Sequence, residues 1–221
     1  MTHSDIYEKF MIEYDKDNVT SSYPSLTRKE QATILDKAYL ALIAQKVTGN
    51  NVRRSGLETD TKSISDLQPL ITSSSITLTP STMPTNEKHG ALPTSTKFLY
   101  FVSAYVKGSN SSQVVTLVNH DVAKRFFVTS YNKPWIKTPV CYIQDGNIHV
   151  VYDPEDQSDV NTMELTFIKQ PAKFVGSQDT TPFELNDSMA EELVTLAITF
   201  ALENIESQRL NSKLNMRGLE A

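Results

Sequence analysis

A thiol and an imidazole come within eight residues of each other at Cys141 and His149. A cysteine acts as a nucleophile when a neighbouring imidazole takes its proton, so this pair is the first place to look for covalent catalysis. The Asp-Gly dipeptide at 145–146 separates two apolar runs and predicts a type I′ hairpin over residues 139–152. Side chains alternate along such strands, which places Cys141 on one face and His149 on the other, beside Tyr142 of the partner strand. We therefore interpret Cys141 as a small buried hydrophobic residue.

Metal-ligand spacing is absent from the sequence. There is no second cysteine and the histidines are scattered, so we predict no structural zinc site. These histidines are His3, His89, His120 and His149. The acidic segment 153–159 carries several carboxylates but lacks the glycine and the final glutamate of an EF-hand loop. We interpret it as a solvated loop, with a hard-cation site as the alternative, and we predict that the chain binds no metal and no cofactor.

Phosphate-binding and hydrolase motifs are also missing. The seven glycines form neither GxxxxGK nor GxGxxG, and no GxSxG elbow is present. Residues 130–133 have the SxxK form without its partner motifs. An enzyme would need a cleft that joins His120 or His149 to two or more carboxylates. We therefore predict no catalytic residues and a protein that is not an enzyme.

A few cations are the candidates for contact with DNA. The net charge is −5 and the pI is about 5.4, so no strongly basic surface attracts nucleic acid. Three cations near the C-terminus follow four-residue steps and share one helical face. We interpret them as a solvated stripe that complements the helix dipole, with contact to nucleic acid or an acidic partner as the alternative. The candidates are Arg53, Arg54, Arg209, Lys213 and Arg217.

Composition is close to that of an ordinary globular protein. The chain has 221 residues, of which 39% are hydrophobic and 21% charged, enough for one good core with an elaboration. Residues 193–202 form the longest apolar-dominated run, which is too short to cross a bilayer, so we predict no membrane association. The first ten residues contain Asp5, Glu8 and Lys9 and no apolar h-region, so we predict no secretory signal.

The segment that organises the chain is a long final helix, predicted over residues 186–216. Ser188 and Glu191 have capping-box spacing at its start. Its first half, 193–202, is apolar on nearly every face and needs neighbours all round, whereas its second half is polar. We expect the first half to lie in the chain's own core and the second half to project toward a partner. The alternative is an ordinary core helix with a frayed tail.

Two helices are predicted near the N-terminus. The first covers residues 4–14, and the second begins at a capping box formed by Thr27 and Glu30 and ends at Gly49. A brief helix is expected at 65–71. The second helix carries apolar residues on two faces, one of which we expect to contact the final helix.

The middle of the chain predicts strands. Residues 98–106 are apolar on both faces, as in a sheet covered on both sides, and further strands are expected at 114–118 and 162–169 beside the hairpin, with a short helix at 119–127. The Ser/Thr/Pro-rich segment before them reads as an extended loop or arm with one strand-like piece at 76–79.

These elements predict an α+β fold, in which N-terminal helices and a long C-terminal helix pack together and an antiparallel β domain lies in the middle. The predicted parts are an N-terminal helical part at 1–72, the arm at 73–95, the β domain at 96–175, and the C-terminal helix and tail at 182–221.

The two ends of the chain carry a resemblance to a known family. Residues 6–10 (IYEKF) lead through 23–27 (YPSLT) into the helix at 34–39 (ILDKAY), followed by 65–70 (SDLQPL) and, far along the chain, the acidic-start helix 187–206. This arrangement resembles virion proteins of crAss-like, short-tailed bacteriophages, in particular the head–tail connector (ring or adaptor) proteins that stack below the portal. The β middle matches them only in kind.

The resemblance implies a structural virion protein at the portal vertex, made in the host bacterial cytoplasm. It implies a homo-oligomer, a dodecamer ring that matches the portal, with DNA passing through the lumen without sequence recognition. Partners would be the portal protein and other connector or tail proteins. The candidate interface residues are Leu196, Phe200, Ile205, Leu210, Leu214, Met216, Tyr39 and Ile43.

A different class of function stays open beside this one. An oligomeric binding module, tail-associated or recognising a carbohydrate or protein on a cell surface, would use the β domain for recognition and the helices for oligomerisation. An exposed cluster of Trp135, Tyr131 and Tyr142 on a concave face would favour it.

Overall fold

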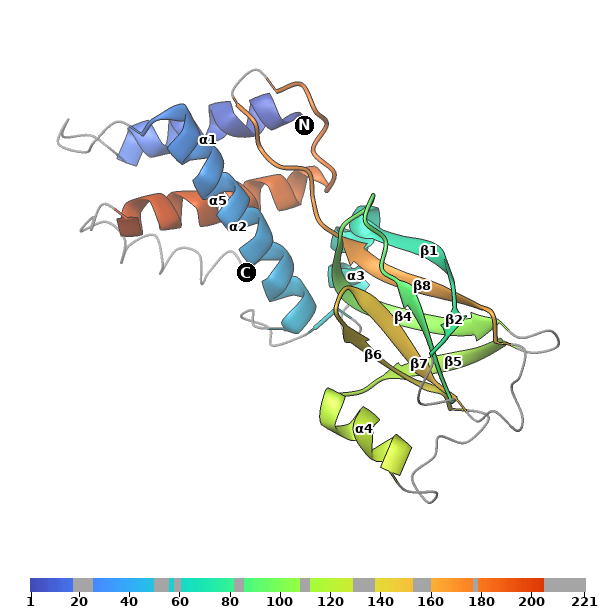
Figure 1. Ribbon diagram of the computed structural model, residues 1–221. Coiled ribbons are helices and arrows are strands. Elements are labelled where there is room, and N and C mark those ends of the chain that lie inside the picture. The colour runs from blue at the N-terminus through green and yellow to red at the C-terminus, as the bar shows by residue number, and fades with distance from the viewer. Residues whose placement is uncertain are drawn as a thin grey trace. The chain divides into compact units, whose positions relative to one another are not determined.

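The computed structural model describes residues 1–17, 26–49, 56–57, 61–81, 86–107, 112–128, 138–152, 160–176 and 179–204. The chain has the predicted α+β fold and divides into two compact units (Figure 1). The helical unit comprises Met1–Leu70 and Pro171–Ala221, and the β unit comprises Ile71–Gln170. The β unit is therefore inserted into the helical unit along the chain.

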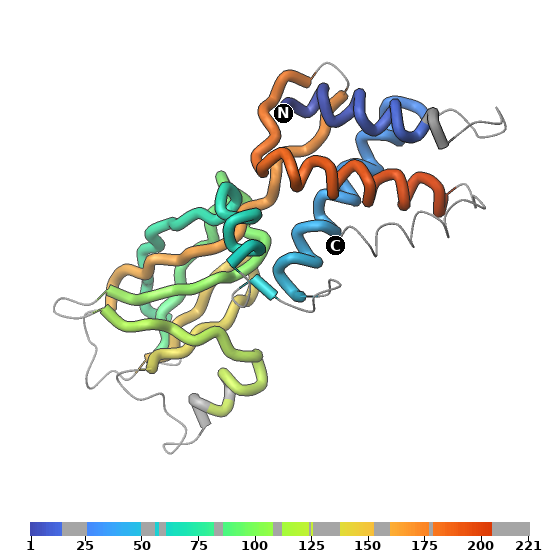
Figure 2. Tube along the Cα trace, turned by 180° about the vertical axis from the view of Figure 1, so that it is seen from behind, coloured from blue at the N-terminus to red at the C-terminus, as the bar shows by residue number. Residues whose placement is uncertain are grey.

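The helical unit joins helices from both parts of the sequence. They are α1 (His3–Asp17), α2 (Arg28–Thr48), α3 (Thr61–Leu67), which continues into the single turn η1 (Gln68–Leu70), and α5 (Asp187–Asn204). The predicted packing of N-terminal helices with the C-terminal helix is confirmed, because α5 lies beside α1 and crosses α2 (Figure 2).

The ends of α2 are where the sequence places them. The Thr27 side chain accepts a hydrogen bond from the Glu30 amide, and the Glu30 carboxylate accepts one from the Thr27 amide at 2.7 Å. At the other end Gly49 adopts φ 73°, the left-handed conformation that closes many helices. The predicted capping box and stop are both confirmed.

The start of α5 differs from the prediction. Asn186, not Ser188, is the capping residue: its Oδ1 accepts a hydrogen bond from the Met189 amide at 3.0 Å and another from the Ser188 hydroxyl at 2.9 Å. The apolar first half is buried as predicted, apart from Thr195 and Phe200, which are half-buried. Of the predicted projecting half, 203–216, the first two residues form the exposed end of α5, and residues 205–216 lie outside the described residues.

The described residues of the β unit form one curled sheet of eight strands, in which all but one of the strand pairs are antiparallel. The parallel pair is β5–β6, whose connection contains α4 (His120–Val128). The strand order is β1-β8-β4-β5-β6-β7-β3-β2. The strands are β1 (Ile71–Thr77), β2 (Thr79–Pro80), β3 (Glu87–Ala91), β4 (Phe98–Lys107), β5 (Ser112–Leu117), β6 (Val140–Gln144), β7 (Asn147–Val151) and β8 (Thr162–Lys169).

The arm predicted over 73–95 is wrong where the structure describes it. Strand β1 pairs along its whole length with β8, and β3 pairs with β7, so the segment belongs to the chain's own sheet. The Ser/Thr-rich composition suits a strand at the end of the sheet order: Ile76 is buried in the core while Ser73 and Ser75 on the other face are exposed. The β unit thus begins at Ile71, well before the predicted boundary at 96.

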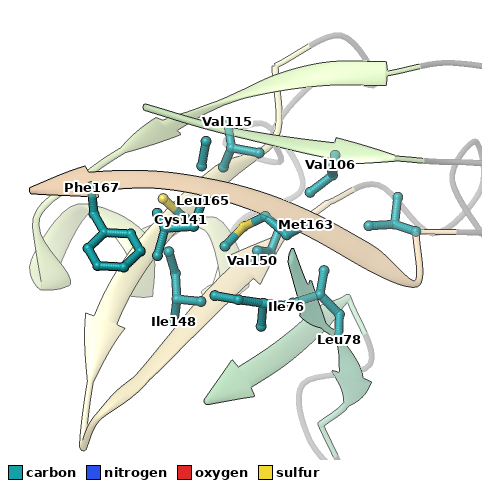
Figure 3. Close-up of a cluster of buried hydrophobic side chains, with 12 residues drawn as sticks. Ile76, Leu78, Val106, Val115, Cys141, Ile148, Val150, Met163, Leu165 and Phe167 are labelled. Carbon is teal, nitrogen blue, oxygen red and sulfur yellow. The ribbon is translucent and has the colours of Figure 1, made fainter. Parts of the chain in front are cut away.

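Curling of the sheet brings its two ends together. Strands β1 and β2 stand at opposite ends of the strand order, yet only Leu78 separates them in sequence. Close packing at this point depends on Gly90 of β3, where a Cβ atom would lie 2.3 Å from Ile76 Cγ2 and 2.9 Å from the Thr77 carbonyl oxygen. The curl encloses a core of side chains that point toward one another, among them Ile148, Val150, Met163 and Leu165 (Figure 3).

Strand β4 is less covered than predicted. Ala104 and Val106 are buried in the core, but residues 98–102 are only half-buried, so the strand is not enclosed on both faces. Two register shifts against β8, between Phe98 and Tyr100 and between Phe101 and Ser103, interrupt the alternation of its side chains. Over the residues described, no helix is long and apolar enough to cross a membrane.

Candidate functional site

The β6–β7 hairpin has the predicted turn and register. Asp145 and Gly146 have φ 51° and 73°, as a type I′ turn requires, and Tyr142 pairs with His149. Cys141 is fully buried in the core, where loss of hydration raises its pKa to about 12. The predicted separation of Cys141 from His149 onto opposite faces is confirmed, so the two do not form a catalytic pair.

The outer face of this hairpin carries a buried carboxylate. The Glu87 carboxylate of β3 accepts a hydrogen bond from the Tyr142 hydroxyl at 2.9 Å and is also hydrogen-bonded to Nδ1 of His149. Glu87 and Tyr142 are buried, while the His149 side chain is 18% exposed. Burial, together with the hydrogen bond to Glu87, raises the pKa of Tyr142.

Four rings form a row around this carboxylate. His120 meets Tyr142 edge-on at a centroid distance of 5.6 Å, Tyr142 stacks on His149 at 4.8 Å, and His149 lies 5.7 Å from His89. Three histidines that are scattered in the sequence thus come from α4, β7 and β3 to one face of the sheet. No spacing in the sequence predicts this row, because the order of the strands brings the rings together.

The row does not have the composition of a hydrolytic site. Within the described ranges Glu87 is the carboxylate bonded to His149, whereas an enzyme was expected to need two or more. Both ring nitrogens of His89 contact hydroxyls, with Ser81 Oγ at 3.2 Å and Thr79 Oγ1 at 3.3 Å. No group of three or more potential metal ligands occurs in the part of the chain that is described. We interpret the row as a structural polar network.

A hollow in the helical unit has a different character. It measures about 670 Å³ and lies between the first turns of α2 and the segment 171–176. The Phe174 amide donates to Asp36 Oδ1 at 2.9 Å, which fixes that segment against α2. Behind the lining, the His3 ring stacks on Phe174 at a centroid distance of 4.3 Å, and its Nδ1 donates a hydrogen bond to Asp179 Oδ2 at 3.0 Å.

Charge and apolar surface meet in this hollow. Arg28, Lys29 and Lys173 are exposed cations on its lining, and Asp36 is the carboxylate there. Val175, also on the lining, is 84% exposed. Cations at the first two positions of a helix oppose the helix dipole, which favours anions at that end. The hollow therefore combines a positive potential with an uncovered apolar side chain.

Three of the four predicted interface residues that the structure describes are buried. Leu196, Tyr39 and Ile43 are core residues of the helical unit, so the expectation that they form an interface is wrong. The apolar side chains of α2 and α5 are buried where these two helices pack against each other. Phe200 is half-buried, with Lys37 Nζ 4.5 Å from its ring centroid.

The remaining predicted site residues lie outside the described residues. They are the interface candidates Ile205, Leu210, Leu214 and Met216 and the DNA-facing candidates Arg53, Arg54, Arg209, Lys213 and Arg217. The acidic segment 153–159 also lies outside them.

Comparison with known proteins does not assign a family. No protein-family model matches the chain, and a search of curated proteins found no match to it.

Proposed function

We propose that the chain is a structural subunit of a ring in the head–tail connector of a crAss-like, short-tailed bacteriophage. The proposal starts from the resemblance of the two chain ends to such proteins. It is supported by the way those ends combine, since α1, α2 and α5 form one helical unit while an independent β unit is inserted between them. The role is assembly and not catalysis.

The observation that carries the proposal is the lining of the hollow on the helical unit. Val175 is 84% exposed there. It lies next to the exposed cations Arg28 and Lys173, neither of which forms an ion pair within the described part of the chain. Further large apolar side chains on the same unit are exposed, with Ile12 at 53% and Leu40 at 40%. Surface of this kind is typical of a subunit that another protein covers.

DNA would pass through the ring without being held. The net charge of −5 suits this role, because a cationic lining would retain DNA through the release of counterions. The proposed partners are sister copies, twelve in a ring, and the portal and tail proteins above and below.

The test is the mass of the protein alone and mixed with its portal protein. We expect a ring, or a ring that forms on the portal, with twelve copies. A stable monomer that ignores the portal would remove the proposal. Deletion of residues 205–221 should leave the fold intact, because Leu202 is the last buried residue described in α5, and should abolish docking onto the portal.

No observation favours the alternative of a recognition module. Tyr142, one of three aromatic residues expected on a concave face, is only 9% exposed and is engaged by Glu87, and the other two, Tyr131 and Trp135, lie outside the described residues.

A further inference from the structure

We propose that the hollow of the helical unit receives the acidic segment 153–159 of a neighbouring copy of this chain. The inference rests on the proposed function and names the contact between protomers around the ring. It is carried by the charge and shape of the hollow, the unusual position of its cations, and the composition of the segment.

The hollow has a net positive lining. Arg28, Lys29 and Lys173 contribute three positive charges, and Asp36 contributes one negative charge. The Asp36 carboxylate already accepts a hydrogen bond from the Phe174 amide, so it lies within the structure and helps to hold the wall of the hollow. An incoming carboxylate would therefore meet exposed cations over most of the lining.

The two cations on α2 stand where a helix does not favour them. Thr27 is the capping residue, so Arg28 and Lys29 are the first two residues of the helix, where the dipole adds its own positive potential. Glu30, the carboxylate of that turn, is committed to the capping box. Unfavourable local electrostatics of this kind is common where a site binds an oppositely charged partner.

The acidic segment has the complementary composition. Four carboxylates and no cation occur within its seven residues: Asp153, Glu155, Asp156 and Asp159. The segment belongs to the β unit and the hollow belongs to the helical unit. A contact between two different surfaces of identical copies is heterologous, and such contacts close into rings when the rotation between copies closes.

The test exchanges the charges on the full-length protein. One variant carries Arg28→Glu, Lys29→Glu and Lys173→Glu, and a second carries Asp153→Lys, Glu155→Lys and Asp156→Lys. Each alone should weaken assembly by about tenfold or more in apparent Kd, measured by sedimentation or native mass spectrometry. An equimolar mixture of the two should assemble again, because alternating copies place opposite charges at every contact.

Single substitutions provide the matched control. Lys173→Glu should weaken assembly, whereas Lys97→Glu, an exposed cation of the β unit, should not. Circular dichroism and thermal melting check that each variant folds, and recovery of assembly in the mixture is itself evidence that both variants are folded.

Two results would overturn the inference while leaving the proposed function in place. The first is a wild-type ring that both triple variants form equally well. The second is a hollow variant that assembles normally but loses affinity for a duplex oligonucleotide, which would assign the hollow to a phosphate backbone. A wild-type protein that never assembles, alone or with the portal, would instead remove the proposed function and this inference with it.

Discussion

The Tyr142 hydroxyl donates a hydrogen bond to Glu87 Oε1 at 2.9 Å, and both side chains are buried. The same carboxylate is bonded to Nδ1 of His149. Strands β3, β7 and β6 are neighbours in the sheet, so this one side chain links three of them through polar contacts. Burying a carboxylate is unfavourable unless its hydrogen bonds are made, and here they are made by residues of adjacent strands.

Removing this carboxylate should destabilise the protein. Glu87→Ala leaves the Tyr142 hydroxyl and His149 Nδ1 without their shared acceptor, so we expect a loss of about 2–4 kcal/mol in the free energy of unfolding, measured with urea. Tyr142→Phe removes one bond and should cost about 1 kcal/mol. Glu191→Ala is the control, since this exposed carboxylate pairs with Lys9 at the surface and should cost less than about 1 kcal/mol. Equal losses for Glu87→Ala and Glu191→Ala would contradict the network.

Substitutions at Asn186 and Ser188, at the start of α5, distinguish the observed cap from the predicted one. Asn186→Ala removes the acceptor of the Met189 amide and the donor to Asp66 Oδ1 at 3.2 Å, and should cost about 1–2 kcal/mol. Ser188→Ala should cost less than about 0.5 kcal/mol, as for a surface substitution. Hydrogen exchange of the α5 amides is the measurement. A larger effect at Ser188 would show that the predicted capping box is the one that forms.

The close approach at Gly90 predicts intolerance of a single methyl group. Gly90→Ala would place its Cβ against Ile76 Cγ2 and the Thr77 carbonyl oxygen, and backbone atoms yield little, so we expect about 1–3 kcal/mol of destabilisation in thermal or urea unfolding. Gly176→Ala is the control, because no neighbouring atom lies within 4 Å of the added Cβ. An unchanged stability for Gly90→Ala would mean that β1 and β3 do not approach as described.

Acid should weaken the attachment of the segment around residue 179 to α1. Hydrogen bonds from the Thr181 hydroxyl and amide, and then from His3, lower the pKa of Asp179 from 3.8 to about 2. A folded-state pKa below the ordinary value means that this stabilisation is present above the ordinary value and is lost as the pH falls toward about 2. Asp179→Asn should therefore lower the free energy of unfolding at neutral pH. It should also make that free energy fall less steeply as the pH drops below the ordinary pKa of an aspartate.

A companion variant separates the causes. Thr181→Val removes the hydroxyl donor but keeps the amide, so it should raise the pKa of Asp179 toward its ordinary value and reduce the same slope in part. Unfolding measured at a series of acidic pH values gives the slope for each protein. A wild-type slope that both variants retain would exclude Asp179 as its source.

Burial of Cys141 predicts a slow thiol. The side chain is inaccessible and its pKa is raised to about 12, so the reactive thiolate is scarce at neutral pH. Alkylation by iodoacetamide, followed by mass spectrometry, should be far slower in the native protein than in urea. Rapid, complete labelling of the native protein would contradict the description of the core.

Local signals account for the parts of the fold that could be predicted. The Asp-Gly dipeptide at 145–146 was sufficient for the turn, the register and the faces of the hairpin, and the Thr27–Glu30 pair was sufficient for the start of α2. Both depend on residues close together in the sequence. Spacing alone predicted the wrong cap for α5, because Asn186, Asp187 and Ser188 are all residue types that cap helices. The hydrogen bond from Asn186 to Asp66, distant in the sequence, favours Asn186.

Long-range pairing accounts for what could not be predicted. Strand β1 reads as a loop by composition, and only its pairing with β8, far along the chain, makes it a strand. The same holds for both candidate sites. The histidine row depends on the strand order, and the hollow joins Lys173 to Arg28 and Lys29 of α2. The cations at the start of α2 were the one local hint of the hollow, because they stand against the helix dipole.

Insertion of the β unit between α3 and α5 sets an order for folding during synthesis. Once residue 170 has left the ribosome, every strand of the β unit is available to pair. Helices α1 and α2 are made first but must wait for α5, whose apolar residues cover theirs. The nascent chain therefore carries uncovered apolar helices through most of its translation, and these are the segments on which a chaperone would act.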